Sequence, residues 1–313
     1  MSIRAFTADE LVDLARNIYA APDSGTTETE DADLLRRINE CYLSTVIGAV
    51  YDTWGEYFYT RRRYQLTQGN SRIRIPSRAV WQSFDDVIYW QGSGRRRLSL
   101  ILSAQARVTE ESDSGEPYQF FVEGNYIHLL PSRPDAGEIE IVFPLRPGQL
   151  VFAAEARRVT NVNTATGTLT LASIVPASWS TGQKFDVHSS KSGAEVKFFE
   201  RTPSSVAGVS ITFGNVTSPD YGELPVEEGD WVCLEGEAVV PGIPLEMHSI
   251  LARAGAIALA EGFKDTEAVA IHAANFQAEL SRAKDFLVPR VTSQTPVVVG
   301  PDFIGMQSRS WCG

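Results

Sequence analysis

The spacing of apolar residues predicts a pair of helices within residues 1–55. In "ADELVDLARNIYA" (residues 8–20) apolar positions recur every three or four residues, with Thr7 or Asp9 as the N-cap. The polar stretch "APDSGTTETEDAD" (residues 21–33) follows as a loop, and a second apolar helical side runs from about Asp33 to Val50. Two helices joined by a short loop are typical of a helical hairpin.

Residues 56–147 predict strands instead. Short runs such as "YFYTRRRYQLT", "DDVIYWQ" and "EIEIVFPLRP" are rich in β-branched and aromatic residues. Turn signals separate them at Gly69–Asn70, Gly92–Gly94, Gly124–Asn125 and Pro134–Asp135. We expect a compact antiparallel β unit.

A second β-rich block, residues 148–241, differs in composition and is full of Thr, Ser, Val and Gly. Within it, "RRVTNVNTATGTLTLASI" predicts a hairpin across Asn163–Gly167. Gly148 and Pro241–Gly242 bracket the block, as expected for a β-barrel-like domain inserted into a parent fold.

Helical spacing returns in residues 242–288. Pro244 at the first helical position and Glu246 in the first turn favour a helix start, and Gly262 favours its end. A second helix begins near Asp265. From residue 291 the chain has two prolines and two glycines before residue 306, which predicts an extended tail over residues 289–313. The fold class is therefore α+β, with a bundle of N- and C-terminal helices.

Composition narrows the classes of function. The 313 residues are 43% hydrophobic and 21% charged, as in ordinary globular proteins, and 28 basic against 39 acidic side chains give a net charge of −11. This balance argues against a general phosphate-binding surface, but it does not exclude a wall past which DNA slides without sticking, because like charge disfavours adhesion. Neither a signal peptide nor a membrane-spanning run is evident. The scattered Cys41, Cys233 and Cys312 indicate incidental thiols in a reducing cytosol.

No constellation predicts an enzyme, a cofactor or a metal site. Glu246 and His248, at the head of the third helix, point about 200° apart on a helix. A metalloprotease helix needs two histidines four residues apart, and this helix has one. The adjacent carboxylates Asp85–Asp86 and Glu227–Glu228 face apart on strands or turns. We therefore expect packing and capping roles for Glu246 and His248.

Three other features point to interactions. The third helix is apolar or small nearly all round, which indicates enclosure in the chain's own core or between subunits. Two basic triplets could dock to acidic partners or contact DNA phosphates, or they are ordinary exposed charge on hairpins. They consist of Arg61, Arg62, Arg63, Arg95, Arg96 and Arg97. The tail has apolar anchors suited to strand addition or groove docking, or to folding back over its own domain: Val298, Phe303, Ile304, Met306 and Trp311.

Six motifs follow one another along the chain. The first three are "LLRRINECYLSTV", "YFYTRRRYQLTQGNSRIRIPSRAVWQSFDDVIYW" and "NYIHLLPSRPDAGEIEIVFPLRP". The others are "GDWVCLEG", "IPLEMHSILARAGAIALAEG" and "FLVPR". In this order they resemble the motifs of the head–tail adaptor (connector) proteins of tailed bacteriophages. The resemblance covers most of the chain with soft motifs, and residues 148–241 depart from the shortest members as an extra domain of unassigned role.

The resemblance implies a ring, twelve-fold in related adaptors, beneath the portal at the capsid–tail junction of a virion assembled in the bacterial cytoplasm. The ring would line the DNA exit channel without reading sequence, and its β unit would face tail nozzle, tail tube or fibre proteins. The tail anchors would bind the portal protein. The ring-packing residues implied are Met247, Ile250, Leu251, Ala254, Ile257, Ala258, Phe276 and Leu280.

Two alternatives stay open. In one, the protein is a tail-tip or baseplate component whose domain 148–241 binds a receptor or carbohydrate. In the other, it is an enzyme such as a cell-wall hydrolase that uses Glu246/His248 or Asp85–Asp86.

Overall fold

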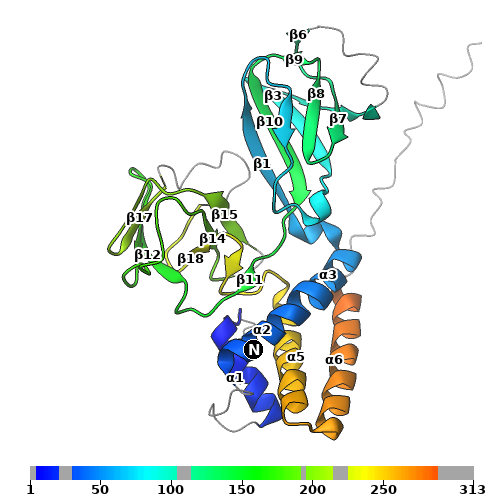
Figure 1. Cartoon of the computed structure of the whole chain (residues 1–313), viewed down its shortest axis with the longest axis vertical. Coiled ribbons are helices and arrows are strands. Elements are labelled where there is room, and N and C mark those ends of the chain that lie inside the picture. Colours follow the sequence, from blue (N-terminus) through cyan, green and yellow to red (C-terminus); the bar gives the residue numbers. More distant parts are fainter. Residues whose placement is uncertain (1–4, 21–29, 104–113, 192–194, 214–224, 288–313) are drawn as a thin grey trace, which may run out of the picture.

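The computed structural model describes residues 5–20, 30–103, 114–191, 195–213 and 225–287 and shows a mixed α+β protein (Figure 1). The helices form one layer, which we call the helical layer: α1 (Ala8–Tyr19), α2 (Asp31–Cys41), α3 (Ile47–Thr53), α5 (His248–Gly262) and α6 (Thr266–Leu287). A π-helical turn, η2 (Tyr42–Val46), joins α2 to α3 and was not predicted. The two ends of the described chain thus meet in one layer.

Local chemistry explains where α1 begins. Thr7 is the N-cap: its side chain accepts from the Glu10 backbone N–H, and the Glu10 carboxylate accepts from the Thr7 backbone N–H. This reciprocal pair satisfies two N–H groups that a helix start leaves free. Ala20 ends the helix with a left-handed backbone, φ 54°. Of the two predicted caps, Thr7 is confirmed.

The start of the third helix differs from the prediction. Pro244 lies before a short 3-10 turn, η5 (Leu245–Met247), and the α-helix begins only at His248. Glu246 therefore sits in the 3-10 turn. Gly262 ends α5 as predicted.

Two small sheets form the first β region, residues 59–145. One has the order β1–β10–β3–β4, from Tyr59–Leu66, Gly137–Pro144, Asp86–Gln91 and Gly94–Arg97. The other has the order β2–β8–β7–β5, from Arg72–Arg74, Tyr126–Leu130, Gln119–Glu123 and Ser99–Leu100. Their facing sides share one core that includes Ile127, Ile139 and Ile141. The pairing is mainly antiparallel as predicted, but β5–β7 and β6 (Ser114–Gly115) with β9 (Arg133–Pro134) are parallel.

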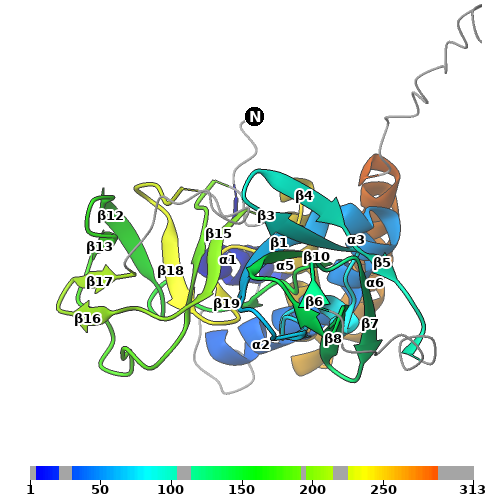
Figure 2. The same cartoon turned by 90° about the horizontal axis from the view of Figure 1, so that it is seen from above.

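The second β region, residues 157–234, contains one seven-stranded sheet that stands beside the first β region (Figure 2). Its order is β15–β14–β18–β12–β13–β17–β16, from Val196–Arg201, Phe185–His188, Trp231–Leu234, Arg157–Asn163, Thr168–Leu171, Ser210–Thr212 and Ser205–Ala207. Asn163 pairs with Thr168, which confirms the predicted hairpin. Among the described residues β15 and β16 remain unpaired edges, so the predicted barrel is not closed.

A parallel pair forms the neck of the second β region: β11 (Gln149–Leu150) lies beside β19 (Glu237–Ala238). The chain therefore enters and leaves the region side by side. Gly148 permits this approach, because a Cβ there would lie 2.9 Å from the Glu237 carbonyl carbon. Real Cβ atoms do not approach backbone so closely, so a side chain at this position would push the two neck strands apart.

The helical layer is packed so closely that two glycines should respond oppositely to alanine. A Cβ on Gly255 of α5 would lie 2.7 Å from the Ala15 Cβ and 3.0 Å from Ile38, whereas one on Gly48 of α3 meets no described atom within 4 Å. We expect Gly255→Ala to lower the free energy of unfolding, because overpacking costs about 1–3 kcal/mol and exceeds the helix-propensity gain. Gly48→Ala should raise it by about 1 kcal/mol. Urea titrations of both variants check the opposite signs, and a gain at both positions would contradict this packing.

Candidate functional site

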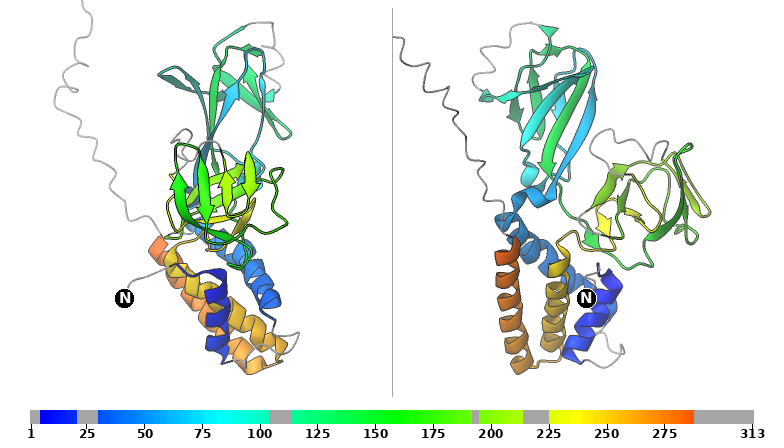
Figure 3. Two further views of the ribbon diagram at one scale, coloured as in Figure 1. Left: turned by 90° about the vertical axis from the view of Figure 1, so that its left-hand side faces the viewer. Right: turned by 180° about the vertical axis from the view of Figure 1, so that it is seen from behind.

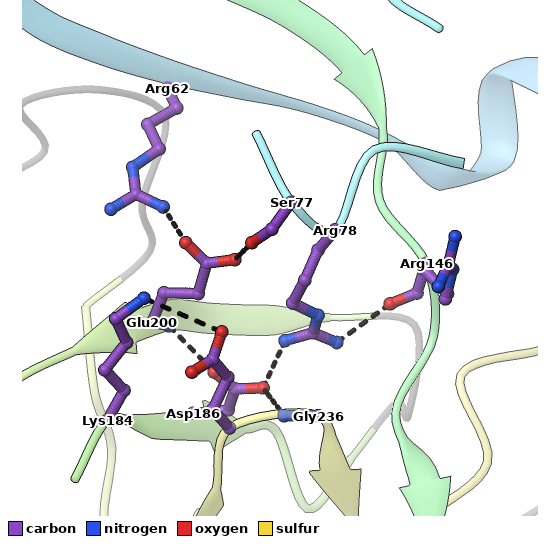
Figure 4. A network of polar contacts seen from close by, with 9 residues as sticks. Arg62, Ser77, Arg78, Arg146, Lys184, Asp186, Glu200 and Gly236 are labelled. Carbon is purple, nitrogen blue, oxygen red and sulfur yellow. Dashed lines mark hydrogen bonds and ion pairs between the residues drawn. The ribbon is translucent and has the colours of Figure 1, made fainter. Parts of the chain in front are cut away.

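A buried ion pair joins the two β regions. Arg78, in the loop after β2, donates from Nη1 to the Asp186 carboxylate on β14, and the two side chains are 9% and 0% exposed (Figure 4). The second Arg78 nitrogen donates to the Arg146 carbonyl at 2.8 Å. Asp186 also accepts from the backbone N–H groups of Glu200 (2.8 Å) and Gly236 (2.9 Å). Each charge is thus paired and hydrogen-bonded, which a buried ion pair requires.

Glu200 on β15 forms the second half of this interdomain joint. Its carboxylate accepts from Arg62 of β1 at 2.5 Å and from the Ser77 hydroxyl at 2.9 Å. Burial opposes ionisation of Glu200, but Arg62 and Ser77 outweigh it and hold the pKa of this carboxyl below its usual value. The Glu200 backbone is left-handed, φ 53°, a conformation that costs about 1–2 kcal/mol for a residue with a side chain. The surrounding bonds hold it there.

Apolar contacts reinforce the joint. Consecutive residues of β15 face opposite ways: Phe198 packs in the core of the second β region, and Phe199 packs in the core of the first. Phe199 lies edge-on to Phe143, with ring centroids 6.1 Å apart, and the Arg62 guanidinium lies 5.3 Å from its ring. One strand therefore belongs to two cores, which fixes the orientation of one region on the other.

The neck is bound to the helical layer in a similar way. Asn39 of α2 donates to the Leu150 carbonyl at 2.9 Å and accepts from the Leu150 N–H at 2.8 Å, both buried. The Ala8 N–H donates to the Val239 carbonyl, and the Gly242 N–H donates to the Tyr42 hydroxyl. The three parts of the molecule are therefore held as one body through buried polar contacts.

Two arginines of the first basic triplet make contacts inside the protein, whereas the second triplet lies at the surface. In the first, Arg63 donates to Glu140 at 2.7 Å and stacks 4.0 Å from the Trp90 ring centroid, and Arg62 belongs to the joint. In the second, on β4, Arg96 pairs with Glu116 and Arg97 with Asp86, both at the surface. Arg61 and the three arginines of β4 are all exposed, with 61% of the Arg61 side chain and 70% of the Arg97 side chain open. Contacts with tail proteins or DNA stay a prediction for both triplets.

The residues predicted for ring packing lie inside the helical layer of a single chain. Six are buried, with Met247, Ile250 and Leu251 no more than 2% exposed, and Ala254, Phe276 and Leu280 at 6–9%. Ile257 and Ala258 pack half-buried at the edge of the same core. Side chains buried within one chain do not contact another. An interface between copies would therefore use other residues than these six.

The outer side of α6 is the open surface of the helical layer (Figure 3). Phe276, Leu280 and Ala283 face α5, while Ala270, Ala274 and Ala278 are exposed on the opposite side. Ile271, between them, is 52% exposed. The middle of this outer side is thus small or apolar, with the exposed Glu267 and Asp285 near its two ends, and no described residue covers it.

An apolar pocket of about 800 Å³ lies between Trp54 and Tyr57 in the segment after α3, the turn η5, the start of α5 and the end of α6. Met247 and Ile250 form part of its floor, and Trp54 and Phe286, 37% and 65% exposed, stand at its opening. Glu246, Glu279 and Arg282 supply charge to its lining. Glu279 is paired with Arg253 at 2.6 Å, whereas no ion pair of Glu246 or Arg282 is found within the described residues. Its volume and lining are typical of a binding pocket.

The structure places Glu246 and His248 in different surroundings. Glu246 lines the pocket, but the His248 side chain is 0% exposed and bonded to backbone. Its Nδ1 accepts from the Phe6 N–H at 3.1 Å, and its Nε2 lies 3.2 Å from the Ile243 carbonyl. Burial lowers the pKa of His248 to about 4. The structure thus gives His248 a packing role, and the expectation that the chain is not an enzyme stays a prediction.

Several candidates can be placed only partly. The tail anchors Val298, Phe303, Ile304, Met306 and Trp311, and Cys312, lie outside the described residues. Burial raises the pKa of Cys41 to about 11 and raises that of Cys233. Across the described ranges, no group of three or more His, Cys, Asp or Glu side chains could hold a metal ion. No helix in those ranges is long and apolar enough to cross a bilayer.

Sequence reasoning missed the joint. Asp186 and Arg78 are 108 residues apart, and Asn39 and Leu150 are 111 apart, so no local spacing connects them. The signal that the sequence offered was "FDVH" (residues 185–188), in which the polar Asp186 and His188 alternate with apolar residues. In the structure all four residues are buried. No protein-family model matches the chain, and no curated protein matches it significantly.

Proposed function

We propose that this protein is a structural head–tail adaptor, which forms a ring beneath a phage portal, joins capsid to tail and lines the DNA exit channel. The observation that carries the proposal is the small-residue side of α6 that no described residue covers, where Ala270, Ala274 and Ala278 would let a neighbouring helix approach closely. Identical subunits that contact head-to-tail close into rings. In this proposal the helical layer is the bundle of the ring body.

The rigid connection between the three parts supports the same function. An adaptor must hold tail proteins in a fixed direction relative to the portal, and the buried joint of Arg78, Asp186 and Glu200 fixes the β regions in this way. The net charge of −11 suits a channel through which DNA passes without adhering. The proposed partners are the portal, tail nozzle or tube proteins, and other copies of the chain.

Native mass spectrometry of the protein, alone and mixed with its portal, tests this proposal. We expect a ring that forms or closes on the portal, and loss of that ring in Ala274→Arg, because an arginine on the outer side of α6 would block helix approach. Ala165→Arg, at an exposed alanine in the β12–β13 turn, is the control and should assemble normally. A stable monomer or trimer indifferent to portal would contradict the proposal and favour a tail-tip component.

The tail assignment has its own test. Deleting residues 291–313 should abolish binding to the portal, because the proposed anchors Phe303, Ile304 and Trp311 are removed, while the secondary-structure content measured by circular dichroism stays unchanged. Unchanged portal binding by the shortened chain would disprove the role of the tail.

A further inference from the structure

We propose that the pocket between η5, α5 and the end of α6 is the docking site of the chain's own segment 302–304, with Phe303 and Ile304 entering the apolar floor and Asp302 pairing with Arg282. This inference goes beyond the adaptor function, since it concerns the chain without portal or ring: Phe303 and Ile304 occupy the pocket until they bind the portal.

The first argument is connectivity. Leu287, where the last described element ends, is itself part of the pocket lining. Residues 288–313 follow it directly in the chain, so the segment is tethered at the pocket wall. A tether of this length gives an effective concentration of about 1 mM. A weak intrinsic affinity is then sufficient for occupancy.

The second argument is the chemistry of the pocket. Its floor is apolar and buried at Met247 and Ile250, but its opening exposes Trp54 and Phe286. Exposed apolar surface that lines a concave site is stabilised when apolar side chains cover it. Phe303 and Ile304 are adjacent large apolar residues, and glycine and proline flank them closely at Gly300, Pro301 and Gly305. Such a short extended segment can enter a pocket without needing a helix.

The third argument is charge. Arg282 lines the pocket and has no ion pair within the described residues. Asp302 is the single acidic residue of 288–313, and it directly precedes Phe303. Seating Phe303 and Ile304 in the floor therefore brings a carboxylate to the side of the pocket that carries a guanidinium. Such a pair also fixes the direction in which the segment enters.

Thiol labelling of the full chain tests the proposal. Ser249 is exposed and lines the pocket, whereas Ser281 is exposed on α6 and does not. Ser249→Cys should react with a maleimide about tenfold more slowly than in the same chain carrying Phe303→Asp and Ile304→Asp, given an intrinsic Kd of about 0.1 mM. Ser281→Cys should react equally fast with either tail. Peptide mass spectrometry distinguishes these sites from the native thiols.

Charge reversal tests the proposed orientation. In the Ser249→Cys background, Arg282→Glu should remove most of the protection, and adding Asp302→Arg should restore it, because the reversed pair can form again. Equal labelling rates of the Ser249→Cys thiol with native and substituted tails would overturn the proposal. So would protection that disappears on dilution, which would assign the pocket to the tail of a second copy. Protection that arises only after portal is added would assign it to that partner instead.

Discussion

Asp186→Asn should detach the second β region from the first and lower the free energy of unfolding by about 3–5 kcal/mol, the usual cost of leaving a buried charge unpaired. Arg78 would keep its charge at 7% exposure but lose its counterion. The asparagine amide has a single oxygen, so it cannot accept from Arg78, Glu200 and Gly236 as the two carboxylate oxygens do. One buried donor is left without a partner, which adds to the loss.

A matched substitution at the surface distinguishes the loss of a buried ion pair from the mere removal of a charge. Asp86→Asn removes the partner of Arg97 in a surface pair, where the arginine side chain is 70% exposed. Exposed pairs contribute about 0–1 kcal/mol, so this variant should unfold almost as the parent does. Urea titration, followed by far-UV circular dichroism, compares the two variants. Equal effects of the two substitutions would show that Asp186 does not hold the joint.

The consequence of Asp186→Asn for shape is also measurable. If the joint is lost while the strands of each region persist, small-angle scattering should show a larger radius of gyration at unchanged secondary-structure content. Arg62→Ala should have a smaller effect in the same direction, because Glu200 would keep its bond to Ser77. We expect the smaller effect from Arg62→Ala because the Arg62 side chain is 29% exposed. The Arg78 side chain, which loses its partner in Asp186→Asn, is only 9% exposed.

The sequence alone predicted the elements whose structure depends on residues that are close neighbours along the chain. The amphipathic spacing of residues 8–20 and the Thr7 cap predicted α1, and the turn at Asn163–Gly167 predicted the β12–β13 hairpin. The position of Pro244 misled because proline is compatible with both a 3-10 turn and the first α-helical turn. Elements that depend on a few adjacent residues were thus predictable, with errors at their boundaries.

Partners distant in sequence were not predictable from one chain. The small-residue composition of α5 correctly indicated an enclosed helix, but composition does not say what encloses it. Gly255 fits against Ala15 and Ile38 of the same chain. The pocket was missed for a similar reason: Trp54, Ile250 and Phe286 come from three separate elements, and only the fold brings them together.

Acidification should destabilise the protein through two buried histidines. Burial lowers the pKa of His188 to about 4, with Asp186 opposing and Arg78 reinforcing the shift, and burial likewise lowers the pKa of His248 to about 4. In the unfolded chain both have a pKa near 6.5. Between pH 6.5 and 4 the unfolded state therefore binds more protons, so the free energy of unfolding falls as pH falls. Each histidine should contribute a loss of about 3 kcal/mol, complete below pH 4.

Substitution distinguishes the two histidines and checks the cause. Neither ring nitrogen of His188 has a hydrogen-bond partner of normal geometry within the described residues, whereas both nitrogens of His248 lie within hydrogen-bond distance of backbone groups. His188→Leu should therefore cost little at pH 7 and should exceed the parent in stability at pH 5, because an apolar side chain neither needs a partner nor binds a proton. His248→Leu should be less stable at pH 7, since the Phe6 N–H loses its acceptor. Urea titrations at pH 7, 6 and 5 measure both slopes. A His188→Leu slope equal to that of the parent would remove His188 as a cause of acid sensitivity.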